Sequence, residues 1–347
     1  MTLDVATYLC AHGYEVSVLT SHHHADAYPK DLPRTFTVVT LPQGNIKWSL
    51  RVARFVRDFI VEHHVAAFVS YRELLYARWL KRQTGAAFVF ALQSMPFYEM
   101  KESSWFARRF YLDKYRRVYR AADAYGVLCD TYKQEIVRLL SLPATSHRVC
   151  VLPNSVRQTT NTLHPKQKEF LFVGRLSRRD KRIDRLLRVW KIAQDKLPDW
   201  QLRIVGDGPE RQSLQSLATD LHLLRISFEG FTTDVQSYYD TASIFCMTSS
   251  FEGWPLVIAE AQANGVVPVL FASFGACQDL VSSSNEGVLI EPFDEEAYAR
   301  ELIALALAEG RLQRMQGMVM QKARTYSPER TGRAWMQMLD HMMNHEL

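Results

Sequence analysis

The sequence predicts an α/β protein built from two doubly wound units, and three observations lead to this fold class. Short apolar runs alternate with helical stretches in both halves of the chain, which is typical of parallel sheets covered by helices. A polar run, residues 157–168, separates the two halves and indicates a linker. A length of 347 residues with 47% hydrophobic residues is enough for two separate cores.

The first half predicts a helix followed by six strands. Residues 3–10 predict a helix that ends near Gly13. Helical stretches separate several of the strand candidates that follow, so we expect a parallel sheet. These candidates are residues 15–20, 36–41, 66–70, 87–92, 124–129 and 148–152.

The second half opens on a buried strand, residues 170–173, followed by Gly174 and Arg175. A polar loop with Lys181 and an amphipathic helix come next. Because open α/β sheets bind ligands at the carboxyl ends of their strands, Arg175 and Lys181 are expected at a ligand site. A forked guanidinium and a compact ammonium together fit a diphosphate. The alternative is a solubilising basic cluster, formed with Arg178, Arg179, Arg182, Arg185 and Arg188.

A second helix start follows the strand-like run 243–247. The pattern predicts a helix over residues 255–264, with Pro255 in its first turn and a stop at Gly265. The amides of such a start are unpaired within the helix, and the helix dipole is positive there. An anion such as a diphosphate is therefore expected against Gly253 and Trp254.

Two carboxylates, Glu252 and Glu260, bracket this helix start. Carboxylates only accept hydrogen bonds, so a pair of them around a phosphate site suits a ligand rich in hydroxyl groups. Glu252 is expected at the mouth of the site, and Glu260 two turns further along the helix. The alternative is a plain amphipathic helix with solvated glutamates.

Taken in order, the motifs of residues 168–300 resemble the retaining glycosyltransferases of family 4, the EX7E group with GT-B architecture. The resemblance implies two Rossmann-like domains that face a cleft, and a bacterial polysaccharide or glycolipid type of enzyme. The matching segments are residues 173–176, 181–184, 202–210, 228–231 and 251–260.

This resemblance implies transfer of a sugar from a nucleotide sugar to an acceptor hydroxyl with retained anomeric configuration. Under it, Arg175, Lys181 and Glu252 are the catalytic candidates. The two basic groups would hold the donor diphosphate and offset the charge on the leaving group, while Glu252 would contact the transferred sugar. The resemblance further implies a UDP- or GDP-linked donor, a glycan or lipid-linked acceptor, no cofactor and no metal.

Donor-binding residues also follow from the resemblance. Glu260 would contact the ribose hydroxyls, and Gly230 and Phe231 would lie near the nucleobase. The full set is Gly174, Gly230, Phe231, Gly253, Trp254, Pro255, Leu256 and Glu260.

Domain limits and acceptor-side residues come from the same comparison. Residues 1–160 would form the acceptor-side domain, residues 161–326 the donor domain, and residues 327–347 a terminal helix that packs back toward the first domain. Gln93 and Ser94 are acceptor-side candidates. Relatives often carry a histidine near Gln93, and glutamine cannot titrate near neutrality, so it could position a substrate but could not accept a proton.

The start of the chain departs from this family. The family opens on a strand and a glycine-rich loop, whereas residues 3–10 predict a helix. We therefore expect that the first strand and its loop are missing and that the first domain is truncated. An inactive or truncated nucleotide-sugar-binding relative is one alternative function, and a GT-B nucleotide-sugar epimerase is another.

Composition favours a cytoplasmic enzyme, with attachment to the inner face of the membrane as an option. No apolar run reaches the roughly 20 residues of a membrane span, and no signal peptide opens the sequence. The five cysteines show no metal-binding spacing. The run His22-His23-His24 is interpreted as solvated, and no motif indicates nucleic acid.

Charge is unevenly distributed, because Lys and Arg outnumber Asp and Glu only in residues 1–160. Residues 105–120 alternate basic and aromatic side chains, a pattern that suits peripheral contact with an anionic membrane. An ordinary helix with buried aromatics is the alternative. Liposome binding by a variant with Arg116 and Arg117 changed to glutamate would separate the two.

Overall fold

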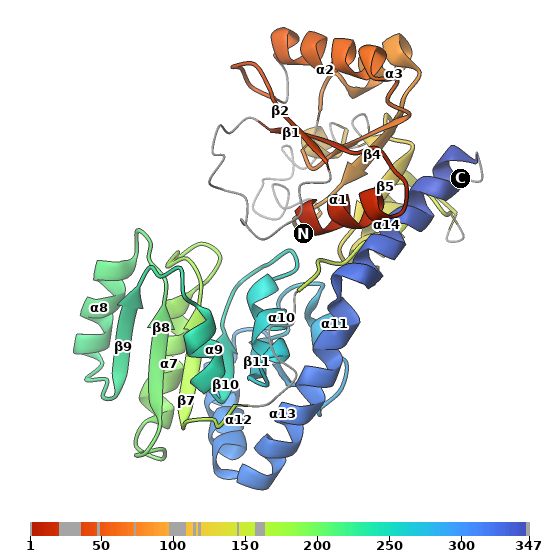
Figure 1. Cartoon of the computed structure of the whole chain (residues 1–347). Helices are drawn as coiled ribbons and strands as arrows, with labels where there is room; N and C mark the ends of the chain where they lie inside the picture. Colours follow the sequence, from red (N-terminus) through yellow and green to blue (C-terminus); the bar gives the residue numbers. More distant parts are fainter. Residues whose placement is uncertain are drawn as a thin grey trace. The chain divides into compact units, whose positions relative to one another are not determined.

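The computed structural model of the chain describes residues 2–20, 36–46, 49–72, 74–96, 109–113, 116, 119–143, 146–156 and 164–344. The chain divides into two compact units, each with its own strands and helices (Figure 1). Unit 1 comprises Met1–Ser155 and Pro328–Leu347, and unit 2 comprises Val156–Ser327.

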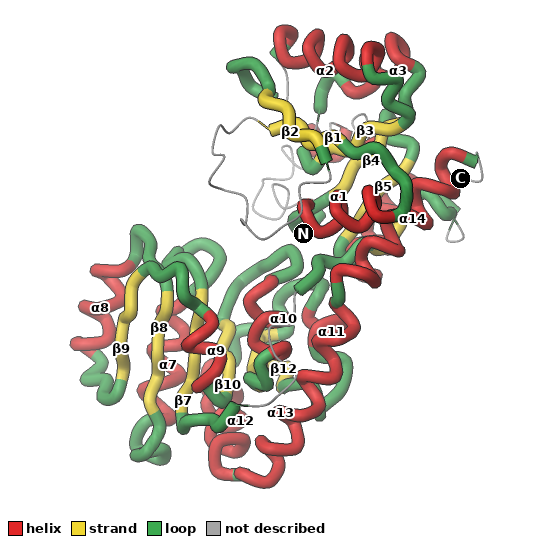
Figure 2. The backbone as a smooth tube through the Cα atoms, viewed as in Figure 1, coloured by secondary structure: helices red, strands yellow, loops and turns green. Residues whose placement is uncertain are grey.

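Unit 2 is built on a parallel sheet of six strands in the order β12-β11-β10-β7-β8-β9. Figure 2 shows β9, β8, β7 and β10 as adjacent yellow segments. The first strand of this unit, β7, lies in the middle of the sheet, and later strands lie on both sides of it. This strand order is typical of dinucleotide-binding sheets. The strands are β7 (Glu169–Val173), β8 (Gln201–Val205), β9 (Ile226–Gly230), β10 (Ile244–Met247), β11 (Val267–Phe271) and β12 (Val288–Ile290).

Helices connect these strands and bury their apolar faces in one large core. Phe170 and Trp190 are almost fully buried there, with ring centroids 5.6 Å apart. Such burial is the main driving force that holds sheet and helices together. The helices are α7 (Ile183–Ala193), α8 (Arg211–Asp220), α9 (Gln236–Thr241), α10 (Leu256–Ala263), α11 (Cys277–Leu280), α12 (Glu295–Leu307) and α13 (Glu309–Ala323), followed by the 3₁₀ turn η2 (Arg324–Tyr326).

Unit 1 contains all six strands predicted for the first half, but they form two parallel sheets rather than one. Strands β1 (Ser17–Thr20) and β2 (Thr37–Thr40) pair only with each other among the described residues. The other four follow one another in space as in sequence: β3 (Ala67–Ser70), β4 (Ala87–Ala91), β5 (Ala124–Val127) and β6 (Val149–Val151). The difference arises because no described strand hydrogen-bonds to both β1 and β3.

The first and last helices of the chain pack against each other within unit 1. Helix α1 (Thr2–Ala11) confirms the predicted opening helix, and the expected terminal helix is α14 (Pro328–Met343). Leu9 of α1 and Trp335 of α14 share one apolar cluster, so the last helix completes the core of the first unit. Unit 1 also contains α2 (Leu50–Glu62), α3 (Ala77–Thr84) and α6 (Asp130–Leu140).

The predicted membrane-surface segment, residues 105–120, falls mostly outside the described residues. In its described part, Phe110 is 68% exposed and Tyr119 is buried. Across the described ranges, no helix is both long and apolar enough to cross a bilayer.

Candidate active site

The candidate site lies at the carboxyl edge of the unit 2 sheet, beside strands β7 and β10. These strands are hydrogen-bonded neighbours, although 70 residues of chain separate their ends. Strand order reverses at this point, because β8 continues on one side of β7 and β10 on the other. In open α/β sheets, ligands bind in the crevice outside the carboxyl ends at such a reversal.

Glycines allow the loops at this edge to approach closely. A Cβ on Gly206 would lie 1.9 Å from the carbonyl oxygen of Gly174, and one on Gly208 would lie 2.3 Å from that of Leu176. Gly174 and Gly206 also have positive φ angles of 156° and 130°. At position 206, only glycine allows both the close approach and the positive φ. The segment Gly206-Asp207-Gly208 therefore brings the end of β8 directly against the end of β7.

Hydrogen bonds join the loop after β7 to the loop after β10. The amide of Ser250 donates to the carbonyl of Asp180 at 2.7 Å, and the hydroxyl of Thr248 donates to the carbonyl of Arg182 at 3.0 Å. Asp180 and Arg182 lie on the loop after β7, and their partners lie on the loop after β10. These hydrogen bonds therefore hold together the two loops that carry Lys181 and Glu252.

Lys181 and Glu252 form a close ion pair at this junction. The ammonium nitrogen of Lys181 lies 2.7 Å from Oε1 of Glu252, and the side chains are 15% and 13% exposed. The hydroxyl of Ser249 donates to the same carboxylate oxygen at 2.8 Å. Partial burial strengthens this pair relative to one on the open surface. In this arrangement the glutamate holds the ammonium beside the end of β7.

Arg175 lies in the exposed part of the same loop and makes no hydrogen bond or ion pair with any described residue. Gly174, one residue before it, lies close to Lys181, because a Cβ there would be 3.7 Å from Cε of the lysine. Arg175 and Lys181 therefore both belong to the loop after β7, where Lys181 is paired with Glu252 and Arg175 is exposed without a pairing partner among the described residues.

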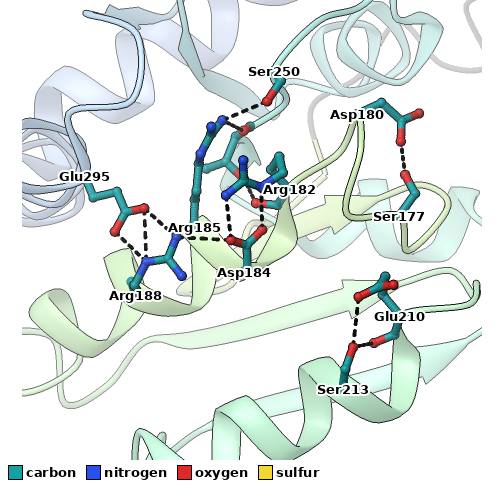
Figure 3. Close-up of polar contacts among 11 residues, drawn as sticks. Ser177, Asp180, Arg182, Asp184, Arg185, Arg188, Glu210, Ser213, Ser250 and Glu295 are labelled. Carbon is teal, nitrogen blue, oxygen red and sulfur yellow. Dashed lines mark hydrogen bonds and ion pairs between the residues drawn. The ribbon is translucent and has the colours of Figure 1, made fainter. Parts of the chain in front are cut away.

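Three of the neighbouring arginines are structural rather than solubilising, which corrects the alternative interpretation for them. Figure 3 shows Asp184 bonded to both Arg182 and Arg188, and Glu295 of α12 facing Arg188. Burial alone would raise the pKa of Asp184, but hydrogen bonds from Arg182 and Arg188 outweigh it and hold the pKa below its ordinary value. Arg178 and Arg179 remain exposed.

Arg185 is the third structural arginine and is itself buried. Its guanidinium donates to the carbonyl of Thr248 at 3.3 Å and to the hydroxyl of Ser250 at 3.1 Å (Figure 3). The same guanidinium stacks on the ring of Phe293 at 3.8 Å. A cation from α7 therefore supports the loop that carries Glu252.

Helix α10 begins one residue later than predicted. Pro255 is the N-cap with extended backbone, and Leu256 is the first helical residue. The difference arises because the φ of proline, here −70°, is compatible with both positions and the ψ of 107° places Pro255 outside the helix. The helix ends at Ala263 with Asn264 as its C-cap, one residue earlier than predicted, and Gly265 follows with a φ of 73°. The N-cap residue Pro255 makes no side-chain capping hydrogen bond.

Trp254 is buried and packs against the edge of the Tyr326 ring, with centroids 5.0 Å apart. Its indole therefore helps to hold the loop after β10 in place, next to the point where the chain leaves unit 2. Leu256 is 38% exposed at the helix start. Gly230 ends β9 with a φ of 80°, and Phe231 after it is 78% exposed.

Glu260 lies on α10 and faces α9. The hydroxyl of Tyr239 donates to its Oε2 at 3.0 Å. Burial raises the pKa of Glu260, and the hydrogen bond from Tyr239 opposes that effect. The solvated arrangement of the alternative interpretation does not apply to this carboxylate.

The acceptor-side candidates belong to unit 1, whereas the other site residues belong to unit 2. Gln93 is half-buried and Ser94 is exposed, both shortly after the end of β4. They therefore lie on the segment that leaves the carboxyl end of β4.

Within the described ranges, no group of three or more His, Cys, Asp or Glu side chains has the geometry of a metal site. The run His22-His23-His24 lies outside those ranges. None of the five cysteines, all of which lie in the described ranges, forms a disulfide.

Sequence reasoning missed Ser249, Tyr239 and Glu295, and it missed the structural role of Arg185. Ser249 stands three residues before Glu252, a spacing at which a hydroxyl can reach a carboxylate, so a local signal existed. The other three act across 21 to 107 residues of sequence, and nothing local indicates their partners.

Two family models match the chain. The description of the first is "Glycosyl transferase 4-like domain", over residues 1–155, and that of the second is "Glycosyl transferases group 1", over residues 157–318. Together they span both units.

Curated relatives are glycosyltransferases of moderate similarity. An uncharacterized glycosyltransferase of Haemophilus influenzae is 28% identical over 87% of this chain and 84% of its own length. The amylovoran biosynthesis glycosyltransferase AmsD of Erwinia amylovora is 26% identical over 54% of this chain. An N-acetylgalactosaminyltransferase of Campylobacter jejuni that acts on a diphosphoundecaprenol-linked sugar is 23% identical over 52% of this chain. The chain spans only about half the length of these last two, 52% and 50%.

Solved structures show the same fold. The Anabaena protein HepE in complex with UDP has a TM-score of 0.78, 16% identity, and coverage of 98% of this chain and 94% of its own. The lipopolysaccharide outer core galactosyltransferase WaaB, in its apo form, has a TM-score of 0.72, 19% identity, and coverage of 100% and 96%. At these identities the likeness shows architecture alone, which is the two-domain α/β fold of GT-B glycosyltransferases.

Proposed function

From the premise that this chain belongs to the glycosyltransferases, with a 4-like domain followed by a group 1 domain, we propose that it transfers a sugar from a nucleotide-sugar donor to an acceptor hydroxyl with retention of configuration. One observation carries the proposal: the fold brings Lys181 and Glu252 to 2.7 Å at the sheet edge where ligands of this architecture bind, and Arg175 belongs to the same loop as Lys181.

The donor diphosphate would bind between Arg175 and Lys181. Arg175 offers an unpaired guanidinium, which suits bidentate contact with phosphate oxygens. When the diphosphate enters, Lys181 exchanges its bond with Glu252 for one with a phosphate oxygen. Both cations then offset the negative charge that grows on the leaving nucleoside diphosphate as the sugar departs.

The same exchange releases one oxygen of Glu252 toward the donor sugar. Glu252 keeps its hydrogen bond from Ser249, so it stays an oriented acceptor for the hydroxyls of the transferred sugar. Helix α10 begins at Leu256, and the positive end of its dipole would add to the field at the diphosphate. Phe231, exposed after β9, offers an apolar face for the nucleobase.

The acceptor is proposed to be a glycan or a lipid-linked sugar of bacterial cell-surface synthesis. This follows the amylovoran enzyme and the transferase that acts on a diphosphoundecaprenol-linked sugar among the relatives. Gln93 and Ser94 are the proposed acceptor-side contacts. They offer amide and hydroxyl groups that hydrogen-bond but do not titrate near neutral pH.

The test is a panel of UDP- and GDP-sugars incubated with purified protein, with and without lipid-linked acceptors. Release of nucleotide that depends on the acceptor is expected. Lys181→Ala should lower kcat/KM for the donor by roughly 100-fold or more, because a cation at the leaving group acts mainly in the transition state. Arg178→Ala removes the same charge from the exposed part of the same loop and should change kcat/KM by less than about twofold.

Other outcomes of the panel would contradict the proposal. Binding without turnover would identify a nucleotide-sugar-binding relative, and interconversion of donor sugars without transfer would identify an epimerase. The retained configuration and the independence of metal are tested with the donor and acceptor that react. Proton coupling constants of the product report the retained configuration. An unchanged rate in EDTA is expected, because arginine, lysine and a helix start would offset the charge of the diphosphate.

A further inference from the structure

Hydrogen bonds link helices α9 and α10 next to Glu260. The side-chain amide of Gln236 on α9 donates to Oδ1 of Asn264 at 2.6 Å, and the Asn264 amide nitrogen donates to the backbone carbonyl of Glu260 at 2.9 Å. From the other side, the ammonium of Lys166 donates to the carbonyls of Tyr239 and Asp240, at 2.8 and 3.0 Å. The backbone positions of Tyr239 and Glu260 are therefore fixed relative to each other.

Tyr239 directs its single proton to Glu260. Its ring is 3% exposed, so the side chain has no alternative position in solvent. Its hydroxyl lies 3.0 Å from Oε2 of Glu260 and 3.4 Å from the carbonyl of Val257, and the nearer, charged acceptor is the stronger partner. Burial raises the pKa of Tyr239 well above its ordinary value, so the hydroxyl remains a donor at any physiological pH.

The second oxygen of Glu260, Oε1, accepts no hydrogen bond from any described residue. It is also absent from the set of fully buried unpaired polar atoms, so solvent reaches it. A carboxylate has about four acceptor positions, and Tyr239 uses one of them. What remains is an oriented pair of acceptors that suits two neighbouring hydroxyl donors on one ligand.

On the basis of the proposed function, we propose that Tyr239 is a positioning residue for donor recognition: its hydroxyl orients Glu260 so that the carboxylate accepts hydrogen bonds from the two ribose hydroxyls. Tyr239 itself does not touch the reacting atoms. Its hydrogen bond also opposes the burial that raises the pKa of Glu260.

The test compares ribose and deoxyribose ligands. Titration calorimetry measures binding of UDP, GDP and their 2′-deoxy and 3′-deoxy forms to the wild type and to Tyr239→Phe. The wild type should prefer the ribose form by roughly tenfold or more, since the loss of one hydroxyl leaves a buried acceptor unpaired. In Tyr239→Phe this preference should shrink to about two- or threefold, with donor KM raised and kcat changed by less than about twofold.

Tyr238→Phe is the matched control, because Tyr238 is on the same helix and its hydroxyl makes no hydrogen bond with a described residue. It should keep the full ribose preference. Glu260→Gln, which is isosteric but donates as well as accepts, should lose the preference whether or not Tyr239 is present. Melting temperatures of all variants separate loss of fold from loss of recognition.

The outcomes distinguish this inference from the proposed function. If the wild type binds no nucleoside diphosphate, both are wrong. If the wild type and Tyr239→Phe show the same ribose preference while Glu260→Gln loses it, the donor site stands and the positioning role of Tyr239 is overturned. Equal loss in Tyr238→Phe would also overturn it, because the effect would then belong to the helix and not to the hydroxyl.

Discussion

Asp184 is a single residue that links three elements around the candidate site. It accepts hydrogen bonds from Arg182, just before α7, and from Arg188 within α7, and Arg188 also binds Glu295 of α12. The Asp184 side chain is 18% exposed, so the charges are only partly screened by water. Removing its charge would leave two guanidinium groups without this partner.

Asp184→Asn is expected to lower the free energy of unfolding at pH 7 by about 1–3 kcal/mol. The folded-state pKa of Asp184 is held below its ordinary value, so its contribution is present above pH 3.8 and is lost as the pH falls through the folded-state pKa. The difference between variant and wild type should therefore shrink only below about pH 4. Urea unfolding from pH 7 to pH 3.5 measures it.

The control for this prediction is Asp199→Asn, whose carboxylate is 73% exposed and 3.5 Å from Lys168. Such a surface pair contributes little, so a change within about 0.5 kcal/mol is expected. A deficit in Asp184→Asn that is the same at pH 7 and pH 3.5 would contradict an ionic origin.

At the scale of elements, the close contact between the ends of β7 and β8 depends on two glycines. The carbonyl of Gly174 occupies the space that a side chain at Gly206 would need. Because this contact lies where the candidate site is built, the same glycines shape the site and hold the sheet edge.

Gly206→Ala is expected to lower the free energy of unfolding by more than about 3 kcal/mol, since its Cβ would meet a backbone atom at 1.9 Å and its φ is 130°. Gly317→Ala is the matched control. Gly317 lies inside α13 with no atom within 4 Å of an added Cβ, and the change should stabilise the protein by about 0.5–1 kcal/mol. Denaturant unfolding of both variants checks this, and equal effects would contradict the steric account.

At the scale of the whole molecule, the chain passes from unit 1 to unit 2 and back again. The two passages lie side by side, because the amide of Val156 donates to the carbonyl of Tyr326 at 2.9 Å. The ring of Tyr326 packs on Trp254, so these passages contact the loop that carries Glu252. The returning helix α14 then completes the core of unit 1.

Gly332→Ala should loosen unit 1 and leave unit 2 unchanged. An added Cβ would lie 2.2 Å from Cγ of Tyr8, a rigid part of that side chain, so α14 must move away from α1. Peptide-resolved hydrogen exchange should show faster exchange in α1 and β4 than in the wild type, with β7 and β8 unaffected. Equal acceleration in both units would contradict this division of the molecule, and Gly310→Ala in α13 is the control.

The amino-acid sequence by itself determined the elements of this protein. Apolar runs of strand length, helix starts at Pro255 and Pro328, and the stop at Gly265 are local properties, and each recurs in the structure within a few residues. Spacing also determined the motif with two glutamates, because Glu252 and Glu260 bracket a single helix start.

Only the tertiary structure decided which side chains meet. The pairing of Lys181 with Glu252 depends on β10 lying beside β7, and that strand order is set by packing of the whole sheet. The same holds for Tyr239 with Glu260. It also holds for the arginines of α7, whose sequence pattern fits a solvated cluster equally well. Partners separated by tens of residues are chosen by the global free energy of the fold, which no local pattern records.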